Sequence, residues 1–167
     1  MCVDFLQREA NMPTIELLKA LLFESVAKLY ANDYYLIARG GMETACQTRV
    51  MYYMQDMLYN APRFDIWRQY NLDCEYNKNM HGVKELPCSN RYAQIDLVLH
   101  IRNTDANNLL VVEFKLSGND NSHDIEKLKN LTDSNQQHRY LLGAAVELAS
   151  QQAMYTFIQN AEISDNN

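Results

Sequence analysis

Residues 91–116 read RYAQIDLVLHIRNTDANNLLVVEFKL, and this stretch decides the predicted fold. Apolar and polar residues alternate in two arms, residues 95–101 and residues 110–116, as they do in strands that have two different faces. The segment between the arms, residues 103–108, is rich in asparagine and aspartate, which favour turns. The stretch therefore predicts a β-hairpin.

The faces of the two arms predict the register of the hairpin. The apolar residues are odd-numbered in the first arm and even-numbered in the second. If both apolar faces point to one core, Asp96 lies opposite an odd-numbered residue, either Glu113 or Lys115. Side chains that lie directly opposite each other are about 5 Å apart at Cβ. The pattern therefore brings Asp96, Glu113 and Lys115 together on one face, while Phe114 points to the other.

The composition indicates a single domain spanning residues 1–167. Of the 167 residues, 47% are hydrophobic and 22% are charged, which is ordinary for a soluble globular protein. No apolar run has the length of a membrane span or follows the pattern of a signal peptide. The four cysteines form no C-x-x-C pair. We therefore expect a cytoplasmic protein with reduced thiols and no membrane partner.

The charge bears on the choice of partner. A formal net charge of −6 argues against strong non-specific binding to nucleic acid. The charge is uneven, because residues 61–115 carry seven basic and seven acidic residues, whereas residues 116–167 carry three and seven. This pattern allows a nucleic-acid partner that is bound with modest, salt-sensitive affinity. It also allows a homodimer or a partner subunit.

The rest of the chain predicts an α/β fold in which a mixed central β-sheet is flanked by helices. Helices are expected at residues 14–30, 42–59 and 124–131, where apolar residues recur with helical spacing. Strands are expected at residues 70–76 and 140–148, and a strand or a helical turn at residues 153–159. The remaining segments are an extended segment at residues 34–37, a loop at residues 77–90 and a frayed tail at residues 160–167.

One acid outside the hairpin is aligned with a buried helix face. The apolar stripe of the helix at residues 42–59 contains Cys46, Val50, Met54 and Met57, and its backward extension reaches Glu43. A carboxylate in the first turn of a helix is stabilised by the helix dipole, which is one explanation of Glu43. An acid in line with the buried face of a helix is unusual, so a position in a site is the other explanation of Glu43.

The hairpin face has the composition of a site for a hard cation. Two acids and a lysine on neighbouring strands are costly to desolvate unless they have partners. Mg²⁺ prefers oxygen ligands from one or two carboxylates together with water and phosphate. Asp96 and Glu113 would hold the ion, and Lys115 would stabilise an attacking hydroxide or the charge that develops on a phosphoryl group. The alternative is a structural α/β domain whose Glu-x-Lys pattern forms a salt bridge across the sheet face.

These residues resemble the PD-(D/E)xK nuclease superfamily. The resemblance covers about residues 14–148 and implies a restriction-endonuclease-like αβββαβ core, a bound Mg²⁺ or Mn²⁺ ion, and hydrolysis of phosphodiester bonds. It implies that Glu43, Asp96 and Glu113 are catalytic metal ligands and that Lys115 is catalytic. A proline often precedes the strand acid in the family, and Ile95 stands there in this chain. Further local features are similar to small, poorly characterised bacterial members, namely Arg49, Tyr53, residues 73–77, residues 96–100, residues 108–115, and Asp124 with residues 127–128.

Four further residues are candidates for substrate binding. His100 shares a strand face with Asp96 and either contacts phosphate or caps the sheet edge. Glu75 and Asn77 lie either near the mouth of the site or in an ordinary strand end and turn. Lys127 either touches a nucleic-acid backbone or lies on a solvated helix face. The sequence thus favours an Mg²⁺-dependent nuclease acting on DNA. The alternative is a catalytically silent nuclease-fold module for nucleic-acid binding or protein interaction.

Overall fold

The computed structural model describes residues 14–40, 42–76 and 94–164, together with the backbone of four short strands between residues 78 and 92. The helices are α2 (Thr14–Asn32), α3 (Tyr34–Arg39), α4 (Glu43–Asn60), the 3₁₀ helix η1 (Pro62–Trp67) and α5 (Ser122–Thr132). The strands of the main sheet are β1 (Asn71–Tyr76), β6 (Ile95–His100), β7 (Asn108–Leu116), β8 (Leu142–Leu148), β9 (Ala153–Gln159) and β10 (Glu162–Ser164). Within these ranges, no helix has the length and apolarity needed to cross a membrane.

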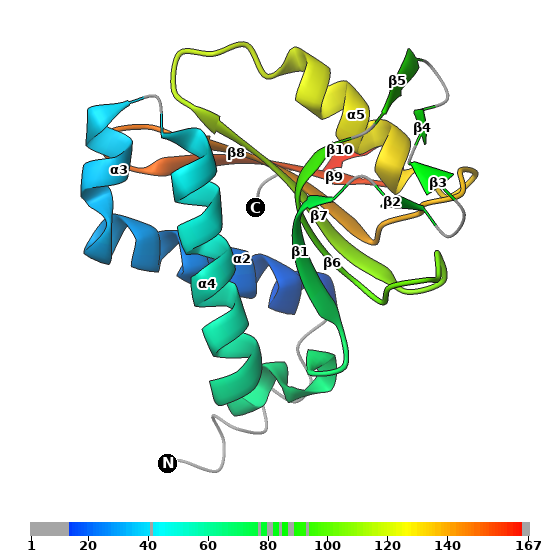
Figure 1. The fold of residues 1–167 in the computed structure, drawn as a ribbon, viewed down its shortest axis with the longest axis horizontal. Helices are drawn as coiled ribbons and strands as arrows, with labels where there is room; N and C mark the ends of the chain where they lie inside the picture. Colours follow the sequence, from blue (N-terminus) through cyan, green and yellow to red (C-terminus); the bar gives the residue numbers. More distant parts are fainter. Residues whose placement is uncertain are drawn as a thin grey trace.

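The main sheet has six strands in the order β1-β6-β7-β8-β9-β10. Every neighbouring pair is antiparallel except β7 and β8, which are parallel. A parallel pair needs a crossover connection, and α5 supplies it here. The predicted α/β fold with a mixed sheet flanked by helices is therefore confirmed (Figure 1).

Helices cover both faces of this sheet. On one face the buried residues of α2 and α4 pack against those of the sheet, among them Leu97, Leu99, Val112 and Phe114. On the other face α5 packs through Leu128 and Leu131 onto a smaller cluster that contains Ile95, Val98, Val111, Ala145 and Ile158. Figure 1 shows α2, α3 and α4 together on one side of the molecule and α5 apart from them. The hairpin faces are as predicted except at Ile95, the first residue of β6, which packs on the α5 side.

Two other predictions of local structure need correction. Residues 34–37 lie in α3 and not in an extended segment. Asp33 starts this short helix, because its carbonyl accepts the Leu36 N–H at 2.9 Å and its carboxylate binds the Arg49 guanidinium at 2.8 Å. Residues 77–90 are not wholly loop, because β2 (Lys78–Asn79) pairs with β3 (Gly82–Val83) and β4 (Glu85–Leu86) pairs with β5 (Ser89–Tyr92). Asn77 itself lies outside the described residues.

The C-terminal segment is more ordered than the sequence indicates. Residues 153–159 form strand β9, which settles the choice between a strand and a helical turn. The predicted frayed tail contains strand β10, in which Glu162 pairs with Gln159 and Ser164 pairs with Phe157. Backbone hydrogen bonds to β9 order these polar residues, although they have little apolar surface of their own to bury. Residues 165–167 lie outside the described part of the chain.

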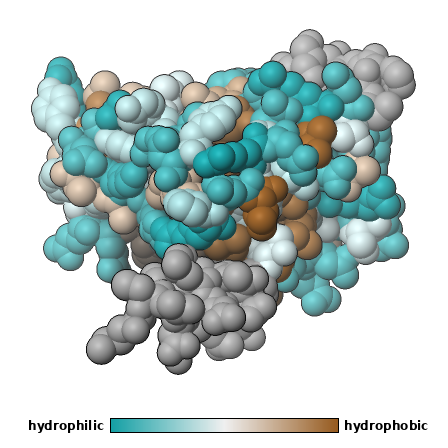
Figure 2. Space-filling model, turned by 90° about the horizontal axis from the view of Figure 1, so that it is seen from below, coloured by the Kyte–Doolittle hydropathy of each residue, from teal (hydrophilic) through white to brown (hydrophobic). Residues whose placement is uncertain are grey.

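The face of the molecule in Figure 2 is mostly hydrophilic, and a small group of hydrophobic residues gathers near its middle. Large apolar side chains that remain exposed in the structure include Phe23, Tyr34, Tyr35, Tyr52, Tyr59, Ile66, Leu141, Met154 and Ile163. Single exposed apolar residues are normal on a folded protein. The buried polar residues are more informative, and four of those with charged or amide side chains, Gln47, Glu113, Asp124 and His100, are discussed below.

Candidate functional site

The hairpin register brings Asp96 and Glu113 together at one end of the sheet. The ladder pairs Leu97 with Val112 and Val98 with Val111, so that Asp96 and Glu113 are the next residues along their strands. At this point the Phe114 N–H donates a hydrogen bond of 2.7 Å to Asp96 Oδ2. The Asp96 carboxylate is thereby fixed against β7. Of the two partners that the sequence allowed for Asp96, the register selects Glu113.

The first turn of α4 closes the end of the two strands. Glu43 Oε2 accepts the Leu116 N–H at 3.1 Å, and Glu43 Oε1 lies 3.9 Å from Lys115 Nζ. One turn later, the buried Gln47 side chain donates to the Asp96 backbone carbonyl. The helix stripe thus aims Glu43 at the hairpin face, as its alignment with the buried residues of α4 predicted.

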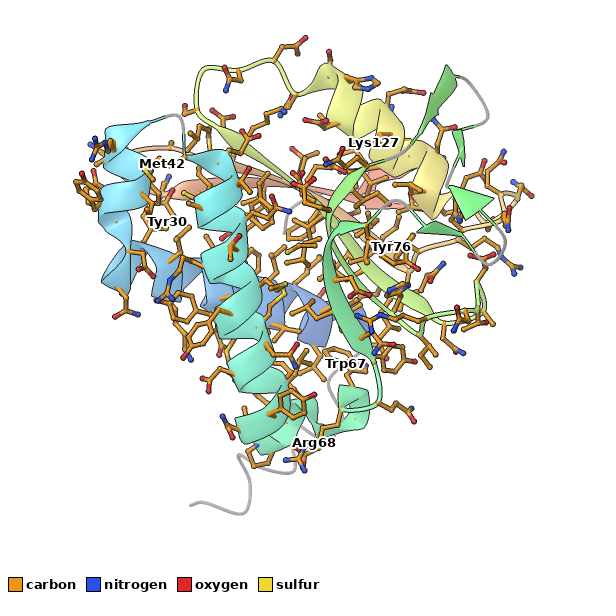
Figure 3. All side chains as sticks on the ribbon, viewed as in Figure 1. Tyr30, Met42, Trp67, Arg68, Tyr76 and Lys127 are labelled. Carbon is orange, nitrogen blue, oxygen red and sulfur yellow. The ribbon has the colours of Figure 1, made fainter. Side chains whose placement is uncertain are left out.

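Helix α5 contributes an acid and a lysine from the opposite side. Asp124 Oδ2 lies 3.3 Å from Lys115 Nζ. Lys127 Nζ lies 2.8 Å from Glu113 Oε1 and 3.9 Å from Asp124 Oδ1. Figure 3 labels Lys127 on α5 and Met42 just before the start of α4. We call Glu43, Asp96, Glu113 and Asp124 the carboxylate cluster.

Burial governs the protonation of the strand acids. Burial, together with the negative charge of Asp96, raises the pKa of Glu113 to about 8, despite the opposing attraction of Lys127. Burial also raises the pKa of Asp96, although the hydrogen bond from Phe114 acts in the other direction. Burial thus favours the protonated form of Glu113 at neutral pH.

Lys115 remains charged in this environment. Burial lowers its pKa, but the carboxylates of Asp124 and Glu43 outweigh burial, and the net pKa of Lys115 is raised. Its side chain is 30% exposed, and with Glu113, Asp124 and Glu147 it lines a narrow recess. Lys115 therefore presents a positive charge toward solvent at the edge of the cluster.

The cluster can be tested for its fit to a divalent cation. Four carboxylates and two ammonium groups sum to a formal charge of −2 when all are ionised, which one Mg²⁺ or Mn²⁺ ion would balance. Carboxylate oxygens are the ligands that such hard cations prefer. Within the described residues, however, no three His, Cys, Asp or Glu side chains are gathered closely enough to form a ready metal site. The donor chemistry and the net charge of the cluster therefore fit a divalent cation. In the present side-chain positions, the ammonium groups of Lys115 and Lys127 lie beside these carboxylates.

The other predicted substrate residues differ in their positions. His100 is four residues from Asp96 along β6, is buried, and has its Nε2 2.9 Å from Asp73 Oδ2. Asp73 also accepts from Arg102 Nε at 2.8 Å, so the structure places His100 in a separate buried cluster and does not bring it to the acids. Glu75 is exposed and accepts from Gln94, and its negative charge contributes to the raised pKa of Asp96.

Asp124 and Gln47 belong to the site although the sequence did not predict them as members, and Lys127 was predicted either to touch a nucleic-acid backbone or to lie on a solvated helix face. Lys127 is only 10% exposed at its side chain, so the solvated-face interpretation is wrong for this residue. A signal was present in the spacing, because Asp124 and Lys127 fall on the same helical stripe as Leu128 and Leu131. The stripe argument that identified Glu43 would have identified both residues.

Comparison with known proteins adds no family. The chain matches no protein-family model, and no curated protein resembles it closely enough to count as a relative. Its function must therefore be inferred from the carboxylate cluster and its surroundings.

Proposed function

We propose that this chain is a metal-dependent phosphodiesterase that cleaves nucleic acid, with DNA as the expected substrate. The observation that supports this most strongly is the convergence of Glu43, Asp96, Glu113 and Asp124 from four different elements onto one end of the sheet. Gathering four acids in one place, with Glu113 and Asp124 buried, is unfavourable unless a cation or another partner compensates their charge.

The order of elements supports the same proposal. Apart from η1 and the short strands β2 to β5, the elements from α4 to β8 come in the order helix α4, strands β1, β6 and β7, helix α5 and strand β8. This is the αβββαβ order that the resemblance to PD-(D/E)xK nucleases implies. Glu43 on the first of these helices and Asp96 and Glu113 on adjacent strands occupy the positions that this resemblance assigns to the metal ligands.

Asp96, Glu113 and Glu43 would hold an Mg²⁺ or Mn²⁺ ion. When bound, such an ion supplies an activated water and positive charge next to a phosphoryl oxygen. The protein fixes the ligands in advance, since Asp96 is held by the Phe114 N–H and Glu43 by the Leu116 N–H. Fixed ligands reduce the reorganisation that the reaction requires.

Lys115 has an electrostatic role in this proposal. Its raised pKa keeps it an ammonium group at neutral pH, so it does not serve as the base that removes the proton from water. Its charge instead stabilises the attacking hydroxide and the negative phosphoryl oxygens. In the hydrolysis the attacking water would lose one proton to bulk solvent, its oxygen would form a bond to phosphorus as the ester P–O bond breaks, and the leaving alkoxide would take up a proton from solvent.

A cleavage assay on a panel of substrates tests the proposal. Single-stranded, duplex and branched DNA and RNA are incubated with Mg²⁺ or Mn²⁺ and, separately, with a chelator. We expect metal-dependent cleavage by the wild-type protein and its loss in Asp96→Ala and Lys115→Ala. Glu126→Ala changes an exposed acid on α5 and should retain activity. Cleavage that persists in both site variants would refute the assignment.

A second function is supported by the ion pairs of the lysines. Because Lys127 lies 2.8 Å from Glu113 and Lys115 lies 3.3 Å from Asp124, the acids already have cationic partners. Such a cluster is compatible with a catalytically silent nuclease-fold module that binds nucleic acid or protein, alone or with a partner subunit. Absence of cleavage on every substrate, together with absence of metal binding by calorimetry, would favour this module.

A further inference from the structure

Lys127 is in an unusual position for a lysine. It lies on the buried stripe of α5, between the fully buried Leu128 and the acid Asp124, and its side chain is 10% exposed. Lysines are almost never so buried unless they are paired. Its ammonium group donates to the Gln94 carbonyl at 2.9 Å and lies 2.8 Å from Glu113 Oε1. Lys127 is therefore anchored to two oxygens from different parts of the hairpin region.

These contacts resemble the oxygen environment of a bound cation. A carboxylate oxygen of β7 and a backbone carbonyl just before β6 converge on one positive charge, and the negative charge of Asp96 is close enough for Lys127 to lower the pKa of that acid. An ammonium group supplies one charge to these oxygens, whereas a divalent ion supplies two and approaches carboxylate oxygens more closely. Lys127 and a divalent ion thus compete for Glu113.

The two lysines of the site, Lys115 and Lys127, differ in which acids they contact. Lys115 forms ion pairs with Asp124 at 3.3 Å and with Glu43 at 3.9 Å, and these two acids lie on helices and not on the hairpin strands. Lys127 pairs directly with Glu113, and it has a second partner on its own helix because Asp124 Oδ1 lies 3.9 Å away. Lys127 can therefore leave Glu113 and still remain beside a negative charge.

We propose that Lys127 occupies the position beside Glu113 Oε1 in the metal-free protein and is exchanged for the divalent ion when the metal binds. Lys127 is then a positioning residue, which sets the affinity of the site for its ion and keeps the buried acids together before the ion arrives. This inference depends on the proposed metal-dependent function, and it adds a competition between lysine and metal at the same acid.

Calorimetry in the absence of nucleic acid tests the competition. Mn²⁺ is titrated into the wild-type protein, Lys127→Met and, as a matched control, Lys129→Met, which removes a charge from the same helix. Because the competing charge is removed, Lys127→Met should bind Mn²⁺ about tenfold more tightly or better, while Lys129→Met should match the wild type. Equal or weaker binding by Lys127→Met would overturn the inference.

Lysine labelling of the wild-type protein tests the exchange without any substitution. Reductive methylation followed by mass spectrometry measures how accessible each lysine is, with Mn²⁺ and with a chelator. We expect labelling of Lys127 to increase several-fold with Mn²⁺, while labelling of Lys129 and Lys28 does not change. Unchanged or reduced labelling of Lys127 in a protein that binds Mn²⁺ would overturn the exchange alone. Failure of the wild type and of Lys127→Met to bind Mn²⁺ would overturn both the exchange and the proposed metal dependence.

Discussion

Replacing Glu113 with glutamine should stabilise the metal-free protein at neutral pH. Glu113 is 4% exposed, and burial, assisted by the negative charge of Asp96, raises its pKa from 4.5 to about 8. Between these two pH values the carboxyl group binds a proton in the folded protein but not in the unfolded chain. The stability associated with this proton is fully present below pH 4.5 and is lost as the pH rises toward 8.

The size of the effect follows from the shift in pKa. Each pH unit within this window lowers the free energy of unfolding by about 1.4 kcal/mol. The accumulated loss is about 1 kcal/mol at pH 5 and about 3 kcal/mol at pH 7. Glutamine has nearly the same shape and no proton to lose, so Glu113→Gln should be free of this loss. Asp96 is present in both proteins, so its own effect on the pH dependence of stability largely cancels when the free energies of unfolding of the two proteins are subtracted.

Urea denaturation with a chelator at pH 5, 6, 7 and 8 measures this difference. We expect the stability of Glu113→Gln relative to the wild type to increase steadily across this series. Glu126→Gln, on the exposed face of α5, provides the matched control and should show no such increase. If the stability profiles of the wild type and Glu113→Gln remain parallel from pH 5 to pH 8, burial does not control the protonation of Glu113 and this reasoning is wrong.

Three further predictions concern the site, the second polar cluster and the packing of α5. In Mg²⁺, Lys115→Met should reduce DNA cleavage by on the order of 100-fold or more while circular dichroism stays native, and unreduced cleavage would exclude its electrostatic role. Asp73→Asn should lower the free energy of unfolding by about 2 kcal/mol in urea, because it weakens charged hydrogen bonds to Arg102 and His100, but it should leave Mn²⁺ affinity unchanged. Gly143→Ala places a Cβ 3.0 Å from Thr132 Cγ2 under α5 and should lower the free energy of unfolding by about 1–3 kcal/mol in urea. An unchanged free energy of unfolding would show that α5 shifts away from the sheet at little energetic cost.

Much of the hairpin could be predicted from the sequence because its two faces differ in composition. A shift of one residue would have turned Val112 and Phe114 out of the larger core, so the register was strongly determined. The same alternation put Glu113 on the opposite face from Phe114, where the structure has it. The predicted contact of Glu43 with this region followed from the periodicity of α4, which extends over 18 residues.

The incorrect or incomplete predictions, for residues 34–37 and for helix α5, also have physical causes. The segment Tyr34–Ile37 has residues that favour strands, but a hydrogen bond to Asp33 and burial of Ile37 against the helices stabilise α3 instead. Asp124 was missed as a member of the site, and the two alternatives for Lys127 stayed open, because charges along a helix are usually explained by the helix dipole or by a solvated face. Their role depends on the position of α5 over β7, which is a tertiary feature that local periodicity does not specify.

Mn²⁺ binding at pH 7 tests the carboxylate cluster most directly, because it requires no knowledge of the polymer that is cleaved. The EPR signal of the free ion gives the number of ions bound per chain and their affinity. We predict one ion per wild-type chain and an affinity at least about tenfold lower in Asp96→Asn, with the affinity of Glu126→Gln unchanged. No bound ion in the wild type, or equal binding by wild type and Asp96→Asn, would contradict the assignment of a metal-dependent site to these residues.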